Sequence, residues 1–130
     1  MKIDHIGYAV KNIGQALESF ENLGFTFEPI VDDPDRNIRI AFGEKDGYRI
    51  ELVCSLDKSK KSPVHTYLSN VGPIPYHICY RSMNLDDKVE KLKRQGFKVI
   101  IEASPSIAFL GKRVIFMMNL ALGLFEIVEA

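Results

Sequence analysis

The sequence has few cysteines, no net charge and no long apolar run, and each of these features argues against one class of protein. Its two cysteines form neither a disulfide framework nor a CxxC pair, so we expect reduced thiols and a cytoplasmic location. Seventeen basic residues balance seventeen acidic ones, which leaves no basic field for nucleic acid. No apolar run reaches the roughly 20 residues that a membrane helix needs. The composition therefore predicts neither a nucleic-acid partner nor a membrane partner.

The sequence contains a duplicated unit. The pattern His-Ile-x-Tyr occurs at residues 5–8 and again at residues 77–80. The second copy follows the first by 72 residues at the two histidines, and by 75 residues at Glu51 and Glu126. This period is too long for solenoid repeats, which run from about 20 to 50 residues. Two copies predict a pseudo-twofold domain, with the function located where the copies agree.

Each copy has the pattern of one strand, one helix and three further strands. Alternating apolar residues predict the strands, and an asparagine before each helix with a glycine after it predicts the helix ends. In the first copy the expected strands are 3–10, 25–31, 38–42 and 48–54, with a helix from Asn12 to Gly24 and a turn at 32–35. In the second copy they are 77–81, 97–102, 114–118 and 122–128, with a helix from Asn84 to Gly96 and an apolar loop at 104–111. Between the copies, Ser62-Pro63 is expected to start a short helix.

The predicted fold class is α+β: two tandem βαβββ modules that form a curved eight-stranded mixed sheet around a metal-binding cleft. A chain of 130 residues is long enough for one shared core. We therefore expect a single domain over 1–130, with module 1 at 1–55, a linker at 56–74 and module 2 at 75–130.

Four polar residues interrupt otherwise apolar strands at matching places in the two copies: His5, Glu51, His77 and Glu126. A carboxylate inside an apolar strand is costly unless it is paired or bound to a cation. Two imidazoles and two carboxylates form a mixed nitrogen and oxygen donor set, which suits a divalent ion such as Zn, Ni, Co, Fe or Mn. Magnesium fits less well, because it prefers oxygen ligands.

Each of these four residues has an ordinary structural explanation when it is taken alone. A single histidine in a strand is usually a hydrogen-bonded core or edge residue, and a single glutamate often faces solvent. Their matched positions in both copies favour a shared metal site. Duplication by itself also preserves residues, so the structural explanation stays open.

These motifs resemble the vicinal oxygen chelate superfamily, which includes glyoxalase I, extradiol dioxygenases, bleomycin-resistance proteins and methylmalonyl-CoA epimerase. Residues 4–10 (DHIGYAV) are similar to the family's first metal-binding strand, and residues 76–80 (YHICY) to the strand of its third ligand. Residues 111–116 and 123–127 resemble the end of methylmalonyl-CoA epimerase. The resemblance covers essentially the whole chain.

The resemblance implies one divalent metal ion (Zn, Ni, Co or Mn) bound by His5, Glu51, His77 and Glu126. It implies an isomerase or epimerase that moves a proton alpha to a metal-bound carbonyl, with Glu126 as both ligand and catalytic base. Epimerases of this family also use an acid on the opposite face, and Arg39 aligns with the strand that carries it. Because an arginine stays protonated, Arg39 departs from the family pattern and is expected to bind a substrate carboxylate or phosphate.

Three functions remain open at this stage. The first is an epimerase for an acyl-CoA or another thioester, and the second is a lactoylglutathione lyase (glyoxalase I)-like enzyme for a hemithioacetal, whose ligand set the four residues also resemble. The third is a non-catalytic small-molecule-binding or resistance protein, which would be expected to lose ligands that this chain keeps. A CoA substrate needs basic contacts, and Lys58, Lys60 and Lys61 form the clustered candidates. The family resemblance also implies a homodimer.

Overall fold

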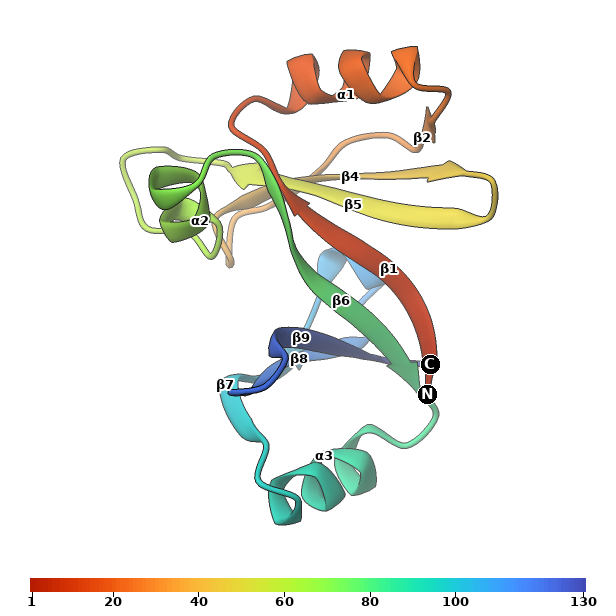
Figure 1. Cartoon of the computed structure of the whole chain (residues 1–130), viewed down its shortest axis with the longest axis vertical. Helices are drawn as coiled ribbons and strands as arrows, with labels where there is room; N and C mark the ends of the chain where they lie inside the picture. Colours follow the sequence, from red (N-terminus) through yellow and green to blue (C-terminus); the bar gives the residue numbers. More distant parts are fainter. The chain divides into compact units, whose positions relative to one another are not determined.

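The computed structural model describes every residue from Met1 to Ala130 and divides into two compact units. The first unit is His5–Tyr76, and the second unit combines Met1–Asp4 with His77–Ala130. The strands of each unit form a mixed segment of β-sheet with a long helix on one of its faces (Figure 1). The expected α+β class is therefore confirmed.

The elements follow the expected order in both copies. The first copy has β1 (Lys2–Ala9), α1 (Ile13–Asn22), β2 (Thr26–Phe27), β3 (Val31–Asp33), β4 (Ile38–Lys45) and β5 (Tyr48–Ser55). A short helix, α2 (His65–Asn70), comes before the second copy. The second copy has β6 (Ile74–Ser82), α3 (Leu85–Arg94), β7 (Lys98–Pro105), the 3-10 turn η1 (Ile107–Phe109), β8 (Arg113–Asn119) and β9 (Gly123–Glu129).

The two units have the same strand order. The first unit reads β1-β5-β4-β2 and the second reads β6-β9-β8-β7. In each, the first strand runs parallel to the last strand of its copy, β1 beside β5 and β6 beside β9, while the other neighbours are antiparallel. The duplication that was inferred from residue spacing is thus present in the pairing of the backbone.

The structure divides the expected strand 25–31 into β2 and β3. Pro29 lies between them and has no N–H for the ladder, while the N–H of Glu28 donates to the carbonyl oxygen of Phe42 at 2.9 Å. β3 also takes in the first residues of the expected turn 32–35 and pairs with β4. Because of this division the chain has nine strands where eight were expected.

Several other boundaries differ from the sequence prediction; β4 continues to Lys45 and β6 already begins at Ile74. The linker helix begins at His65 without a side-chain cap, later than the expected start at Ser62. β7 continues to Pro105, because Ser104 and Pro105 still pair with β8. A proline is tolerated here because β7 is the edge strand of its sheet.

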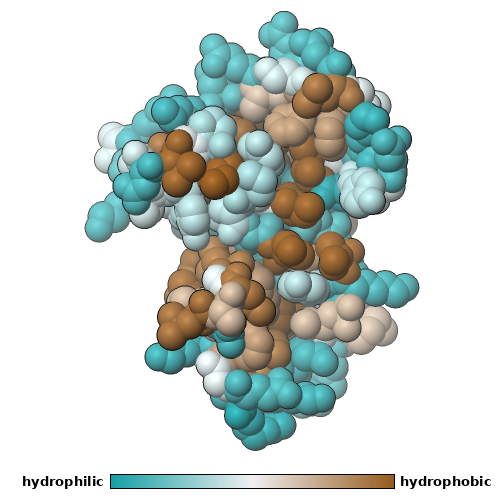
Figure 2. Space-filling view, viewed as in Figure 1, coloured by the Kyte–Doolittle hydropathy of each residue, from teal (hydrophilic) through white to brown (hydrophobic).

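The cores of the two units lie between each helix and its sheet. Leu52, Ile50 and Ala41 pack beneath α1, and Ile127, Met117 and Val89 pack together at α3. Hydrophilic side chains cover the outward surfaces where α1 and α3 lie (Figure 2). None of the helices combines the length and the apolar character that crossing a bilayer requires.

The equivalent asparagines before the two long helices act differently. The Asn12 side-chain oxygen accepts a hydrogen bond from the Gln15 N–H at 2.9 Å, which satisfies an amide in the first turn of α1. The Asn84 side chain instead donates to the Asp87 carboxylate at 2.7 Å and makes no capping bond. Gly24 and Gly96 follow the helices with φ of 101° and 92°, a conformation that favours glycine.

This difference predicts unequal effects of the same substitution. Asn12→Ala is expected to lower the free energy of unfolding by about 1 kcal/mol, because it removes a capping hydrogen bond. Asn84→Ala is expected to lower it by less than half as much. Urea unfolding of both variants measures the difference, and equal losses would contradict this account of the caps.

Candidate metal centre

The first unit holds one buried histidine–glutamate pair. Parallel pairing of β1 with β5 sets Gly7 beside Glu51, and His5 lies on the same face of β1 as Gly7. His5 and Glu51 are 1% and 5% exposed, and the His5 Nε2 lies 3.5 Å from a Glu51 carboxylate oxygen. The ring of Phe42, which pairs with Glu51 across the sheet, contacts the His5 ring edge-on at 5.5 Å.

The second unit holds the equivalent pair in the same register. Parallel pairing of β6 with β9 sets Cys79 beside Glu126, and His77 lies on the same face of β6 as Cys79. The His77 Nε2 lies 3.2 Å from Glu126 Oε2, and both residues are less than 5% exposed. Phe116 pairs with Glu126 and contacts the His77 ring edge-on at 5.3 Å.

The donor atoms of each pair fit a divalent transition metal. Two ligand atoms at about 2.1 Å from one ion lie about 3.0 to 3.4 Å apart at octahedral or tetrahedral angles. The two nitrogen–oxygen separations, 3.5 and 3.2 Å, are close to this range. A carboxylate that is buried this deeply needs a compensating cation or hydrogen bonds. Each unit therefore supplies one imidazole and one carboxylate of the kind that the sequence analysis expected.

One difference separates the two carboxylates. The Cys79 S–H has two acceptors within reach, Glu126 Oε1 at 3.5 Å and the Tyr80 carbonyl oxygen at 3.7 Å. The other Glu126 oxygen, Oε2, faces His77. The equivalent residue in the first unit is Gly7, which has no side chain. Only Glu126 of the two thus has a thiol beside it on the neighbouring strand. The sequence analysis had treated Cys79 as a small buried apolar residue; its place two residues after His77 is the signal that would have identified it.

The structure places Arg39 on the face of its sheet that does not carry His5 and Glu51. Arg39 pairs with Cys54 across the sheet, whereas Phe42 pairs with Glu51, so Arg39 and Glu51 lie on opposite faces. The guanidinium of Arg39 is held by the Asp32 carboxylate at 2.7 and 3.1 Å. This hydrogen-bonded pairing lowers the pKa of Asp32. A substrate contact by Arg39 therefore stays a prediction, and the register does not support it.

A different arginine lies on the face that carries Glu51. Arg49 precedes Glu51 by two residues on β5, and its guanidinium carbon is 4.0 Å from the centre of the Phe42 ring. Glu28 lies 3.6 Å from Arg49. The alternation of Arg49 and Glu51 along one strand was the sequence signal for this placement.

Arg113 forms hydrogen bonds to the end of β9, the strand that carries Glu126. Its backbone N–H donates to Glu129 at 2.7 Å and its guanidinium donates to the same carboxylate at 2.6 and 2.9 Å. The guanidinium also bonds both Asp86 oxygens, at 3.0 and 3.1 Å. Arg113 thus joins the start of β8, the end of β9 and the first turn of α3. Its hydrogen bonds lower the pKa of both carboxyl groups.

The chain belongs to the glyoxalase/bleomycin resistance protein/dioxygenase superfamily, whose sequence model matches residues 4–116. This match confirms the resemblance that the two His-Ile-x-Tyr motifs suggested.

Individual relatives match over most of the chain. The ethylmalonyl-CoA/methylmalonyl-CoA epimerase of Cereibacter sphaeroides is 29% identical over 119 residues, which cover 89% of this chain and 87% of that protein. The uncharacterized protein YqjC of Bacillus subtilis is 29% identical over 117 residues, 89% of this chain and 81% of that protein. A crystal structure of methylmalonyl-CoA epimerase from Mycobacterium tuberculosis aligns with a TM-score of 0.85 and 28% identity over 98% of this chain and 87% of that chain.

The Arg113 contacts predict how stability depends on pH. Because the folded-state pKa values of Glu129 and Asp86 are lowered, their stabilisation is present above the unfolded-state values near 4 and is lost as the pH falls through the folded-state values. The free energy of unfolding is therefore expected to decrease from about pH 5 downward.

Urea unfolding of the wild type and of Glu129→Gln between pH 7 and pH 3 measures this effect. The variant is expected to be less stable at pH 7 and to show a shallower decrease below pH 5. Parallel curves for the two proteins would show that Glu129 makes no contribution to the acid sensitivity.

Proposed function

We propose that the protein is a divalent-metal-dependent epimerase that moves a proton at the carbon alpha to the carbonyl of an acyl-CoA thioester. The observation that carries the proposal is the buried His–Glu pair that recurs in the same register in both units. In this proposal His5, Glu51, His77 and Glu126 bind one shared ion. The support is chemical: neither pair alone offers enough ligands, and together they supply four.

The relatives favour a CoA thioester over a glutathione hemithioacetal. The relatives from Cereibacter sphaeroides and Mycobacterium tuberculosis are named as methylmalonyl-CoA epimerases and are 29% and 28% identical to this chain. Each match covers at least 87% of both proteins. Because the similarity extends over the whole fold, we carry the substrate class, an acyl-CoA with an acidic alpha proton, to this chain.

Glu126 is the base in this proposal. The C–H bond at the alpha carbon breaks, the proton passes to the Glu126 carboxylate, and the electron pair moves toward the thioester carbonyl oxygen. A divalent cation held by the four side chains supplies Lewis-acid stabilisation for the negative charge that develops there. Return of the proton from Glu126 to the same face completes an exchange, whereas inversion of the carbon needs a proton from a second acid on the opposite face.

Cys79 is the positioning residue for that base. Its S–H bond to Oε1 and the His77 contact to Oε2 give the two carboxylate oxygens different surroundings. A carboxylate that is fixed at both oxygens loses less rotational freedom when it takes up a proton. Glu51 has a glycine at the equivalent place, so we assign it to the metal alone.

The shared site predicts the metal stoichiometry. The purified protein is expected to bind one divalent transition-metal ion per chain. Glu51→Ala and Glu126→Ala are each expected to weaken binding by tenfold or more, because both carboxylates contact the same ion. Elemental analysis, followed by titration of the metal-free protein with Zn, Ni, Co and Mn, measures both quantities.

Glu90→Ala is the matched control, because this exposed carboxylate pairs with Lys93 on α3. It is expected to bind metal as the wild type does. Two ions per chain, each lost by one substitution only, would show that the two pairs act separately. No bound metal after reconstitution would contradict the proposed function.

The proposed base predicts the exchange chemistry. Metal-loaded protein in deuterated water is expected to exchange the alpha proton of methylmalonyl-CoA, which nuclear magnetic resonance detects. Glu126→Gln is expected to slow exchange by about 100- to 10,000-fold, because it removes the proton acceptor. Exchange into the glutathione hemithioacetal in place of methylmalonyl-CoA would favour the lyase.

Substitution of Cys79 extends the same measurement. Cys79→Ala is expected to lower the exchange rate by about 2- to 10-fold with little change in KM, since one weak hydrogen bond to the base is lost. Cys79→Ser, which keeps a donor, is expected to restore most of the rate. Cys54→Ala is the control, because Cys54 packs beneath α1. Equal effects at the two cysteines would show that Cys79 acts through packing alone.

A further inference from the structure

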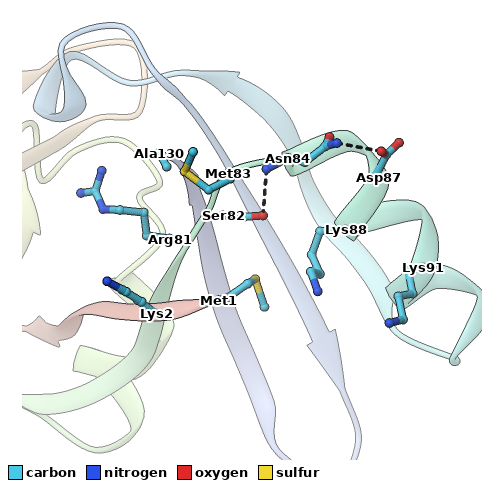
Figure 3. A pocket seen from close by; sticks show the side chains of 10 residues that line it. All are labelled: Met1, Lys2, Arg81, Ser82, Met83, Asn84, Asp87, Lys88, Lys91 and Ala130. Atoms are coloured by element: carbon cyan, nitrogen blue, oxygen red, sulfur yellow. Dashed lines mark hydrogen bonds between the residues drawn. The ribbon is translucent and has the colours of Figure 1, made fainter.

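The second unit contains a pocket that the His77–Glu126 pair does not use. It has a volume of about 740 Å³ and lies at the ends of β1 and β6 beside α3 (Figure 3). This volume falls within the roughly 300–1,000 Å³ that is typical of small-molecule sites. Four of its lining residues are basic: Lys2, Arg81, Lys88 and Lys91.

One stripe of α3 supplies the polar wall of this pocket. Asn84, Asp87, Lys88 and Lys91 follow the spacing i, i+3, i+4, i+7, so they share one face of the helix. Leu85 and Val89 lie on a different face, buried against the sheet. Figure 3 shows Lys88 and Lys91 extending from the helix on the side where Met1 and Lys2 lie. The helical periodicity of α3 therefore places Lys88 and Lys91 on the face that lines the pocket.

Positive charge exceeds negative charge in this pocket. Asp87 is the acidic side chain of its lining, and Asn84 already donates to that carboxylate at 2.7 Å. Arg81 bonds Asp4 through its Nε and Nη2 atoms. The other basic side chains of the lining can attract an anion: Lys2, Lys88 and Lys91. The thioethers of Met1 and Met83 give the pocket an apolar part.

We propose that this pocket binds a phosphate-bearing anion of nucleotide size. Several ammonium groups from two elements match a phosphate or diphosphate, which spreads its charge over several oxygens. The methionines match the apolar faces of a base or an alkyl chain. The sequence analysis had expected phosphate contacts from Lys58, Lys60 and Lys61, which belong to the other unit.

Two sources carry this chemistry: the nucleotide end of an acyl-CoA, or a separate phosphorylated ligand. Arg81 follows His77 by four residues on β6, about 13 Å at the rise of a strand. α3 packs on Phe125 and Ile127, on the face opposite Glu126, so the first source requires the pantetheine arm, which is longer than this when extended, to pass around the end of β6. The presence of an anion site is independent of the proposed epimerase activity, and its test needs neither metal nor turnover.

The test is a calorimetric titration of the metal-free protein, residues 1–130, with adenosine 3′,5′-bisphosphate. The wild type is expected to bind, with an affinity that decreases as salt is added. The double variant Lys88→Gln/Lys91→Gln is expected to bind about tenfold more weakly or worse, because two charged donors are lost. Lys93→Gln is the matched control, since Lys93 lies on the same helix, pairs with Glu90 at 3.1 Å and does not line the pocket.

Two results would overturn the proposal: no binding by the wild type at millimolar concentration, or equal weakening by Lys93→Gln, which would indicate diffuse attraction to α3. Steady-state kinetics with methylmalonyl-CoA then identify the source. If the double variant raises the KM for methylmalonyl-CoA and keeps kcat, the pocket holds the nucleotide end of the substrate. If the bisphosphate binds and KM is unchanged in the double variant, the pocket holds a separate phosphorylated ligand.

Discussion

The parallel pairing of the first and last strands of each copy is the constraint on which the candidate centre depends. It brings His5 to Glu51 and His77 to Glu126, residues that are distant in the sequence, because the register fixes Gly7 opposite Glu51 and Cys79 opposite Glu126. A shift of one residue would move each histidine to the other face of its sheet. The apolar cores beneath α1 and α3 hold the register, since the same shift would expose Leu52 and Ile127.

The duplication explains why the two halves carry similar donors, and the differences between them suggest separate tasks. Both copies keep the histidine, the glutamate and the phenylalanine that contacts the imidazole. The copies differ where Cys79 replaces Gly7, and this gives Glu126 a hydrogen-bond donor on the adjacent strand. This donor helps to orient the Glu126 carboxylate, and Gly7 offers Glu51 no equivalent side chain. The asymmetry therefore favours Glu126 over Glu51 as the base.

Residue spacing predicted the two βαβββ copies, the order of their elements along the chain and the four candidate donors, because duplication preserves offsets that are visible without a structure. It did not predict which face Arg39 occupies. β4 is buried on both faces, with Ile40 and Phe42 on one and Ala41 on the other, so apolar alternation does not identify the face of the candidate centre. The division of strand 25–31 at Pro29 depends on a partner strand that local sequence does not reveal. The expected homodimer stays a prediction.

A net charge of zero excluded a basic field over the whole chain, but it says nothing about local charge. Charges interact over about 8 Å at physiological ionic strength, so a pocket responds to the side chains that line it. The helical period of α3 places Lys88 and Lys91 on the pocket face, while Lys93 pairs with Glu90 and does not line the pocket. A protein with no net charge can in this way have a cationic pocket. The helix α3 contributes two of the pocket's lysines on one face and packs its apolar face against the core of the second unit. The His77–Glu126 pair uses one face of β6 and β9 and the pocket uses the strand ends, so the second unit has room for both proposed roles.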